Sequence, residues 1–189
     1  MAKTYTSVPT VSTLATYPSA TYNTYTAQNI NNLIVPPMAR LRLTANVSFT
    51  NNTHGTVGFK NTNATEDYDT DGMITLSGSN SAITINTAGV YSCQAAVNFA
   101  ANATGQRFGR IVRNRSGVLT AISTFAFTPA ISSDFHSPLA GSIECEVGDV
   151  IDLYCLQTSG SALNLQPADG SGIQYGGTWL TATWVGRTS

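Results

Sequence analysis

The sequence predicts an all-β sandwich of eight to ten short strands, preceded by an extended N-terminal arm. Two observations carry this prediction. From Met38 onward, apolar and polar residues alternate in short runs that Gly, Asn, Asp and Ser residues separate at close spacing. No stretch of this region has a strong 3.6-residue apolar period, so we expect little helix.

The alternating runs give the expected strands in order. They cover residues 40–44, 56–59, 82–86, 90–99, 107–113, 118–127, 139–147, 149–156, 162–165 and 178–185. Turn residues lie between them, and Gly148-Asp149 suits a tight hairpin that needs a positive φ angle. The pattern therefore predicts a sheet protein whose strands are joined mainly by short turns.

The first 28 residues have a different composition. They are rich in Thr, Tyr, Ser and Ala, with no heptad and no helical apolar stripe, so they cannot bury a core of their own. They nevertheless include Tyr5, Tyr17, Tyr22 and Tyr25, and tyrosines on an extended segment are good anchors for a partner surface. We predict an arm that orders on another subunit, with a flexible tail as the alternative.

The joint between arm and head is marked by prolines. Residues 27–35 could form one or two helical turns, and Pro36-Pro37 then ends any helix and imposes an extended chain. We therefore assign residues 1–37 to the arm and residues 38–189 to the head domain.

Charge is scarce along the whole chain. Only 10% of the 189 residues are charged, against about a quarter in an average soluble domain. Such a surface suits coverage by neighbouring subunits, since few charges must be desolvated. With a net charge of −1 and no basic stripe, nucleic acid is not an expected partner. No apolar run is long enough to span a membrane, and the N-terminus lacks an apolar signal core, so we expect synthesis in a cytoplasm.

No pattern in the sequence predicts catalysis or a cofactor. His54 and His136 are the only histidines, and neither has metal-ligand spacing to a Cys or to the other His. His136 shares a predicted loop with Ser132 and Asp134, but triads are assembled from separate elements that orient each member. We expect a non-enzymatic protein that needs no cofactor.

The three cysteines fit a core rather than a disulfide framework. Cys93, Cys145 and Cys155 each lie on the apolar face of an alternating run. An odd count without a secretion signal argues against disulfides, so we interpret all three as small core residues.

An acidic segment gives the one candidate metal site. Asp67, Asp69 and Asp71 match the opening of a helix–loop–helix calcium loop, but the position of its bidentate Glu is Gly78. A non-standard Ca²⁺ site remains an alternative, and a solvated acidic loop closed by the Asp71-Gly72 turn is the favoured interpretation.

Two groups of side chains are candidate interface residues. Much of the positive charge falls in one strand region, which either pairs with acids on a neighbouring subunit or forms an ordinary outward face. The final strand adds two large indoles, which could serve the core or an interface. These candidates are Arg107, Arg110, Arg113, Arg115, Trp179 and Trp184.

An ordered set of motifs then runs through the second half of the chain. It comprises Gly89-Val90-Tyr91, Gly105 with Arg107, the runs 113–117 and 139–143, the hairpin 147–153, the run 157–163 and the run 175–180. In order and spacing this set resembles the complement-type globular head, a tumour-necrosis-factor-like jelly roll, over residues 38–186. The resemblance implies a homotrimer. Animal members follow a collagen stalk and a secretion signal, and neither is found here.

The arm, its Pro36-Pro37 joint and the acidic stretch 66–73 are similar to features of virion proteins of tailed phages of actinobacteria. This resemblance implies a phage structural protein on the virion exterior, made in the host cytoplasm. We expect a trimeric capsid decoration protein whose arm anchors to the major capsid protein. The alternative is the receptor-binding tip of a tail fibre or baseplate, or another minor tail protein, with residues 166–176 as a candidate loop for a host surface glycan.

Overall fold

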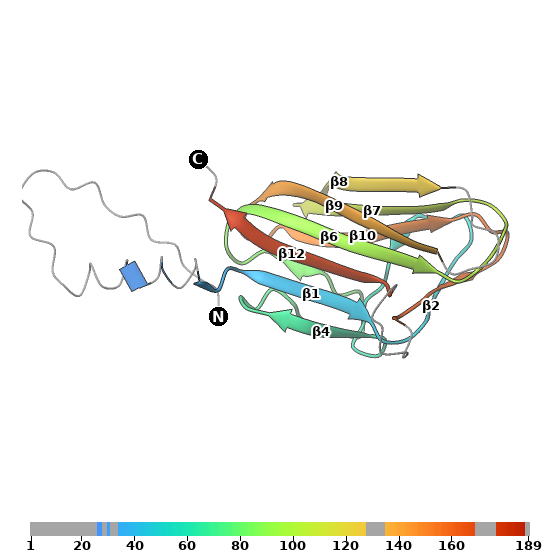
Figure 1. Ribbon diagram of the computed structural model, residues 1–189, viewed down its shortest axis with the longest axis horizontal. Helices are drawn as coiled ribbons and strands as arrows, with labels where there is room; N and C mark the ends of the chain where they lie inside the picture. Colours follow the sequence, from blue (N-terminus) through green and yellow to red (C-terminus); the bar gives the residue numbers. More distant parts are fainter. Residues whose placement is uncertain (1–25, 28–29, 31–33, 128–134, 169–176, 188–189) are drawn as a thin grey trace, which may run out of the picture.

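The computed structural model describes residues 26–27, 30, 34–127, 135–168 and 177–187 (Figure 1). The described chain contains twelve strands, of which ten have three residues or more, in line with the eight to ten expected. They are β1 (Met38–Leu43), β2 (Val47–Phe49), β3 (Gly55–Thr56), β4 (Ala64–Asp69), β5 (Ile83–Thr84), β6 (Gly89–Phe99), β7 (Arg107–Arg115), β8 (Val118–Phe127), β9 (Phe135–Cys145), β10 (Val150–Gln157), β11 (Leu163–Leu165) and β12 (Trp179–Gly186).

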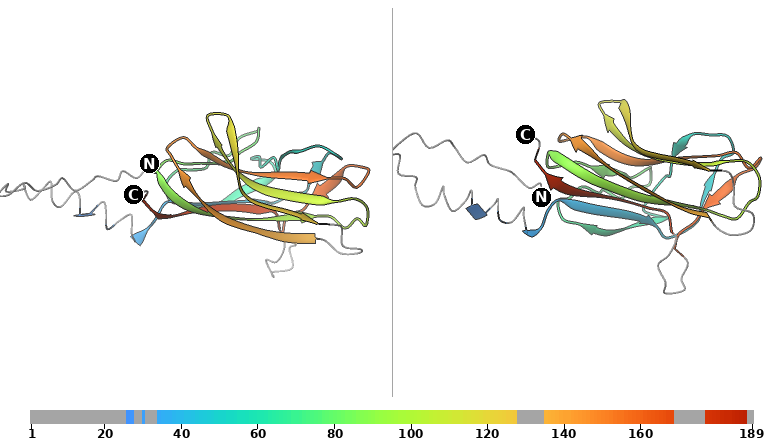
Figure 2. Two further views of the ribbon diagram at one scale, coloured as in Figure 1. Left: turned by 90° about the horizontal axis from the view of Figure 1, so that it is seen from above. Right: turned by 45° about the horizontal axis from the view of Figure 1, so that its top comes forward.

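The strands form two antiparallel sheets that pack face to face (Figure 2). The seven-stranded sheet has the order β2-β11-β6-β12-β1-β4, with β9 on the other edge of β6. The five-stranded sheet has the order β3-β10-β7-β8, and β5 also pairs with β10. Many of these neighbours are distant in sequence, which makes the architecture a jelly-roll sandwich and confirms the predicted fold class.

Alternation along each strand places the core between the sheets. In β1, Ala39, Leu41 and Leu43 are buried, while Arg40 and Arg42 lie on the outer face. The same alternation runs through β6, where the odd-numbered residues from Tyr91 to Phe99 have no exposed surface. Burial of these apolar side chains stabilises the sandwich by about 25 cal/mol for each Å² removed from water.

All three cysteines are free thiols in this core, as predicted. Burial raises the pKa of Cys93 and of Cys145 to about 12, and it raises the pKa of the fully buried Cys155 as well. A thiol with so high a pKa is not a nucleophile at neutral pH. The three residues therefore act as small apolar side chains.

Two hairpins have turn residues with positive φ angles, and the one at Gly148-Asp149 was predicted. Ser116 and Gly117 join β7 to β8 with φ angles of 50° and 87°, and two successive positive φ angles match the twist of the flanking strands. Gly148, with φ of 91°, joins β9 to β10 at the expected Gly148-Asp149 turn.

One predicted loop is a strand. The favoured interpretation of residues 66–71 as a solvated acidic loop is wrong, because residues 64–69 form β4 and pair with β1 along most of its length. The sequence hides this strand because Glu66, Asp67 and Asp69 have low β propensity. The ion pairs of Asp67 with Arg40 and Arg42 offset part of this unfavourable β propensity.

Both ends of the head leave it at the same place, which we call the arm end. Met38 at the start of β1 is paired with Thr183 near the end of β12, and Trp184 donates its backbone N–H to Pro37 O at 2.8 Å (Figure 1). Of the helical turns expected at 27–35, the described residues Ala27, Ile30 and Ile34 are helical. The four arm tyrosines Tyr5, Tyr17, Tyr22 and Tyr25 lie outside the described residues.

Candidate interaction surfaces

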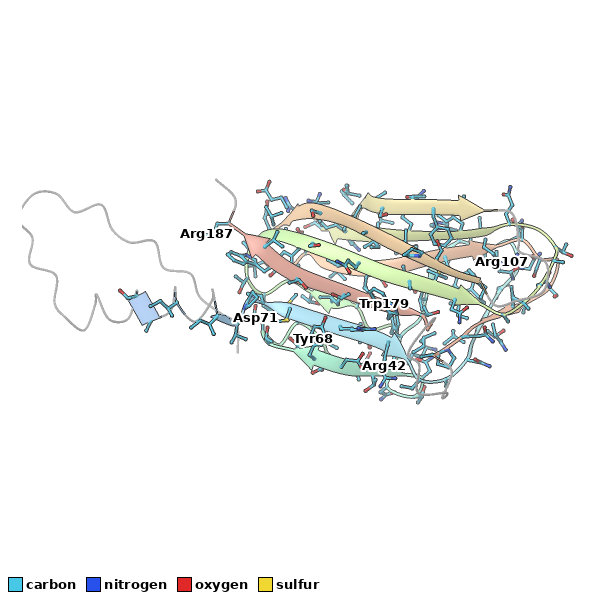
Figure 3. All side chains as sticks on the ribbon, viewed as in Figure 1. Arg42, Tyr68, Asp71, Arg107, Trp179 and Arg187 are labelled. Carbon is cyan, nitrogen blue, oxygen red and sulfur yellow. The ribbon has the colours of Figure 1, made fainter. Side chains whose placement is uncertain are left out.

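A cluster of charged and aromatic side chains lies on the outer face of the seven-stranded sheet. It consists of Arg40 and Arg42 from β1, Asp67 and Tyr68 from β4, and Trp179 from β12, and we call it the Trp179 patch. The register pairs Arg42 with Trp179 on one side of β1 and Arg40 with Tyr68 on the other. Figure 3 shows Arg42, Tyr68 and Trp179 on these three neighbouring strands.

Contacts within the Trp179 patch hold its members in place. The Arg40 guanidinium lies 4.7 Å from the centroid of the Trp179 ring, a cation–π distance. Asp67 accepts a hydrogen bond from Arg42 Nε, and its other carboxylate oxygen lies 3.3 Å from Arg40 Nε. Tyr68 remains 38% exposed. Trp, Tyr and Arg are the residue types that dominate the binding energy of protein interfaces.

Small uncharged residues continue this face beyond the Trp179 patch. Gln94 and Ser92 of β6 lie opposite Thr181 and Thr183 of β12 in the register. On the far side of β6, Ala140 and the neighbouring outward residues of β9 are exposed. This outer face can therefore be covered by a partner with little desolvation of charge.

Trp184, a candidate interface residue, is a core residue. Only 9% of it is exposed, and its indole N–H lies 3.3 Å from Ala88 O, to which it donates. The ring covers Gly89, where an added Cβ would lie 2.1 Å from Trp184 Nε1. The two indoles of the final strand thus have separate roles, because alternation along β12 directs Trp179 outward and directs Trp184, like Leu180 and Ala182, into the core.

Arg107 is used inside the domain. It is 2% exposed and donates to the carbonyl oxygens of Asn102, Thr104 and Gln106 at 3.0–3.1 Å, so it fixes the loop before β7. Its guanidinium also lies 5.8 Å from the centroid of the Phe99 ring. Desolvation lowers the pKa of Arg107 from its usual value, yet the group stays cationic at neutral pH.

The other three candidate arginines do not form one patch. Arg113 donates to Glu144 O at 2.8 Å and so joins the two sheets. Arg115 pairs with Asp149 and Glu146 of the next hairpin. Arg110 alone lies on the outer face of the five-stranded sheet, 4.9 Å from the centroid of the Phe108 ring. Of the arginines in this strand, Arg110 is therefore the one that remains a candidate for contact with another subunit.

The acidic candidates for Ca²⁺ point in different directions. Asp67 faces the arginines of β1, and Asp69 accepts the backbone N–H groups of Asp71 and Ile74 at 3.1 and 2.8 Å. Asp71 is fully buried and accepts the Thr87 hydroxyl at 2.8 Å. No three carboxylate, imidazole or thiol groups in the described chain come together as a cation site. Asp69 and Asp71 of this motif instead form hydrogen bonds that connect the end of β4 with Thr87, just before the strand that begins at Gly89.

Two further carboxylates have perturbed pKa values. Hydrogen bonds from Arg115 and from the Glu146 backbone outweigh burial and lower the pKa of Asp149. Burial raises the pKa of Asp152 to about 6, even though the Leu153 N–H and the Asn80 amide donate to it at 2.8 and 3.0 Å. Asp149 is thus a structural partner of Arg115, whereas Asp152 is a buried acid without a cation.

Exposed apolar side chains gather at the arm end. The described chain has eight large exposed apolar residues: Ile30, Ile34, Val35, Tyr68, Val118, Leu119, Val147 and Val185. Tyr68 belongs to the Trp179 patch, and Ile30, Ile34 and Val35 precede β1. The strand register explains why Val118, Leu119, Val147 and Val185 lie at one end, because Gly89 pairs with Cys145, Val90 with Gly186 and Asn114 with Val150. The β7–β8 turn, the β9–β10 turn and the end of β12 therefore lie toward the end of the head where β1 begins (Figure 2).

Some predicted site residues cannot be placed. The candidate loop 166–176 is described only to Ala168, and Ser132 and Asp134 lie outside the described residues. No helix in the described chain is long and apolar enough to cross a membrane.

Comparison with known proteins shows a likeness of fold. No protein-family model and no curated protein matches the chain. Eiger TNF from S. frugiperda superposes with a TM-score of 0.58 at 11% identity, over 81% of this chain and 94% of that one. Murine APRIL at pH 8.0 gives 0.55 at 15% identity, over 79% and 98% of the two chains. The globular domain of zebrafish complement 1qA gives 0.53 at 12% identity, over 80% and 99%.

These likenesses identify the fold as a TNF-like jelly roll, which the motifs of the second half implied. At identities of 11–15% the likeness concerns the fold alone.

Sequence reasoning missed the arginines of the Trp179 patch. The alternation Arg40-Leu41-Arg42-Leu43 already placed both arginines on one face of a strand. Their partners Asp67 and Trp179 come from strands far away in sequence, so the cluster required the sheet order to be known.

Proposed function

We propose that this protein is a virion structural protein of a tailed phage, a trimeric capsid decoration protein whose arm binds the major capsid protein. The observation that carries the proposal is the concentration of attachment features at one end of the head. Residue 38, where the head begins, is there, and seven of the eight large exposed apolar residues of the described chain lie at this end or just before β1, whereas Tyr68 belongs to the Trp179 patch. An apolar surface of this kind typically marks a binding site.

The geometry supports docking through the arm end, with the opposite end of the sandwich facing outward. The exposed fractions of Val118, Val147 and Val185 are 67%, 68% and 57%, and their burial against a capsid would add to whatever the arm contributes. Two contacts joined by one chain reinforce each other, because binding of the arm raises the effective concentration of the head at the surface. A decoration protein that contacts several capsid subunits stabilises the shell by this binding free energy.

The outer face of the seven-stranded sheet supports self-association. It combines the Trp179 patch with small uncharged residues around it. An aromatic and arginine cluster bordered by weakly charged surface is a composition typical of protein interfaces. We propose that this face packs against a second copy in a homotrimer, so that the three arm ends point the same way.

The first test compares the full chain with a form that lacks residues 1–35, by light scattering and by binding to purified empty capsids. We expect both to be trimers and only the full chain to coat capsids. Full-length Val147→Asp should bind capsids more weakly, whereas Ala103→Asp, at the opposite end, should bind like the wild type. Trp179→Ala should weaken the trimer.

Each result separates the hypotheses. Capsid binding by neither form would refute decoration and favour the tail-tip alternative. A monomeric head lacking residues 1–35 would show that the arm, and not the sheet face, makes the trimer. Equal capsid binding by Val147→Asp and Ala103→Asp would refute docking through the arm end.

A further inference from the structure

The outer face of the five-stranded sheet carries a set of aromatic and polar side chains that meet one another. Alternation directs Phe108 and Arg110 of β7 and Tyr154 of β10 outward, because the residues beside them on each strand are buried. The register places Arg110 between Tyr154 on one side and Thr124 of β8 on the other. These four residues and His54, from the segment between β2 and β3, form a cluster that we call the His54 shelf.

Ring contacts hold the His54 shelf together. The centroid of the His54 ring lies 5.7 Å from that of Phe108 and 5.6 Å from that of Tyr154. The guanidinium carbon of Arg110 lies 4.9 Å from the Phe108 centroid. These distances are typical of aromatic and cation–π contacts. Because His54 and Thr124 are exposed and the other three residues are half-buried, the cluster forms an accessible surface.

Arg110 is held in place while its outer end stays available. Its Nε donates to Thr124 Oγ1 at 3.1 Å, and one face of the guanidinium lies over Phe108. Neither Nη atom has a hydrogen-bond or ion-pair partner in the described chain. Two adjacent Nη groups match the two oxygens of a carboxylate, and a side chain that is already ordered loses less entropy when it binds.

The charge of Arg110 is not neutralised on this face. Asp152 is the one carboxylate at the outward positions of β7, β8 and β10. Its two oxygens accept the Leu153 N–H and the Asn80 amide at 2.8 and 3.0 Å, so they are already engaged. The Tyr154 hydroxyl adds a second donor that bonds to no group in the described chain. The His54 shelf therefore combines a positive charge and free donors with aromatic rings, and its complement is an anionic group beside an apolar one.

We propose that the His54 shelf docks an acidic peptide segment of another protein, with a carboxylate on the Nη groups of Arg110 and a neighbouring apolar side chain on Phe108 and Tyr154. Tyrosine and arginine are among the residue types that dominate the binding energy of protein interfaces. Arg110 is the one cation at the outward positions of the three strands, whereas nucleic acids and anionic membranes are bound through several basic residues.

The His54 shelf lies toward the end of the sandwich away from the arm. Phe108 and Arg110 belong to the half of β7 that is distant from the β7–β8 turn, which lies at the arm end. The shelf also belongs to the sheet opposite the Trp179 patch. The inference therefore goes beyond the proposed capsid role and does not depend on it.

The test is an NMR titration of the full chain with the peptide acetyl-Leu-Asp-Leu-Asp-Leu-amide. One control peptide has Asn in place of Asp and lacks the charge, and a second has Ser in place of Leu and lacks the apolar side chains. We expect the acidic apolar peptide to shift the ring signals of His54, and each control peptide to bind about fivefold more weakly or less. Inorganic phosphate and an oligothymidylate supply other anions, and neither should shift these signals at the same concentration.

Side-chain variants locate the contact. Arg110→Gln should weaken binding of the acidic peptide about tenfold, and Arg110→Lys should restore only part of it, because an ammonium cannot form the paired hydrogen bonds. Thr124→Val removes the acceptor that holds Nε and should weaken binding about twofold to threefold. Lys60→Gln removes the same charge from an exposed residue outside the shelf and should bind like the wild type.

Four results would each overturn the proposal: no binding of the acidic peptide, equal binding of its uncharged form, wild-type binding by Arg110→Gln, or tighter binding of phosphate or oligothymidylate. Thermal unfolding of each variant shows whether a loss of binding comes from a loss of folding. Arg110→Gln is expected to coat capsids normally, so a failure of this site is distinct from a failure of the decoration role.

Discussion

Asp152 offers a direct test of how burial and stability are linked in this domain. Its side chain lies on β10 and accepts a hydrogen bond from Asn80, only 7% of the residue is exposed, and it forms no ion pair with any cation of the described chain. Burial raises its pKa from 3.8 to about 6. The folded state therefore holds the proton more tightly than the unfolded state does. Stability should rise as the pH falls from about 6 to about 4, and at neutral pH the buried charge is a cost.

The magnitude follows from the same shift. A displacement of about two pH units at about 1.4 kcal/mol each amounts to about 3 kcal/mol at pH 7. Asp152→Asn removes the charge, keeps an oxygen for the Leu153 N–H, and requires only that the exposed Asn80 amide turn over. We expect this variant to be more stable than the wild type at pH 7 by about 1–3 kcal/mol, after an allowance for imperfect repacking.

The assay is urea unfolding at fixed protein concentration at pH 7.0, 5.5 and 4.5. The wild type should gain stability on acidification over this range, and Asp152→Asn should not. Glu144→Gln, which neutralises an exposed carboxylate on β9, is the control and should follow the wild type. A pH dependence in Asp152→Asn as steep as that of the wild type would refute the reasoning.

Two further variants test other parts of the core. Gly89→Ala should destabilise the head by about 1–3 kcal/mol or more, because its Cβ would lie 2.1 Å from Trp184 Nε1 at a φ angle of 154°; unchanged thermal unfolding would contradict this packing. Arg115→Gln leaves the buried Asp149 carboxylate without its partner and should lower the free energy of unfolding at pH 7. Because the pKa of Asp149 is lowered in the folded state, this loss should begin to shrink as the pH falls below about 4 and should vanish only below the lowered pKa, where the carboxylate is protonated in both states. A deficit for Arg115→Gln that is as large at pH 3 as at pH 7 would show that Arg115 acts by packing and not by charge.

Much of the fold could be predicted from local patterns. The alternation in β1 and β6 and the turn at Ser116-Gly117 are local properties, because side-chain direction and turn type depend on neighbouring residues. Strand β4 could not be predicted this way, since its acidic residues have low β propensity and the strand forms by pairing with β1, where Asp67 contacts Arg40 and Arg42.

The candidate interface residues likewise could be listed from the sequence but could not be placed by it. From the sequence, Arg107, Arg113 and Arg115 looked like one positive stretch, and Trp179 and Trp184 looked equivalent. The structure directs the three arginines to carbonyls and acids inside the domain and separates the two indoles. Whether a long side chain lies inward or outward depends on the second sheet, which no local pattern contains.

By itself, the sequence determined the class of fold: a weakly charged, all-β head with three core thiols and the strand and turn pattern of a TNF-like jelly roll. Only the tertiary structure decided where surfaces form. The Trp179 patch and the apolar arm end each combine residues from strands that are distant in the chain. The physical reason is that strand pairing order is set by long-range packing, which assembles a site from segments that carry no mutual signal in sequence.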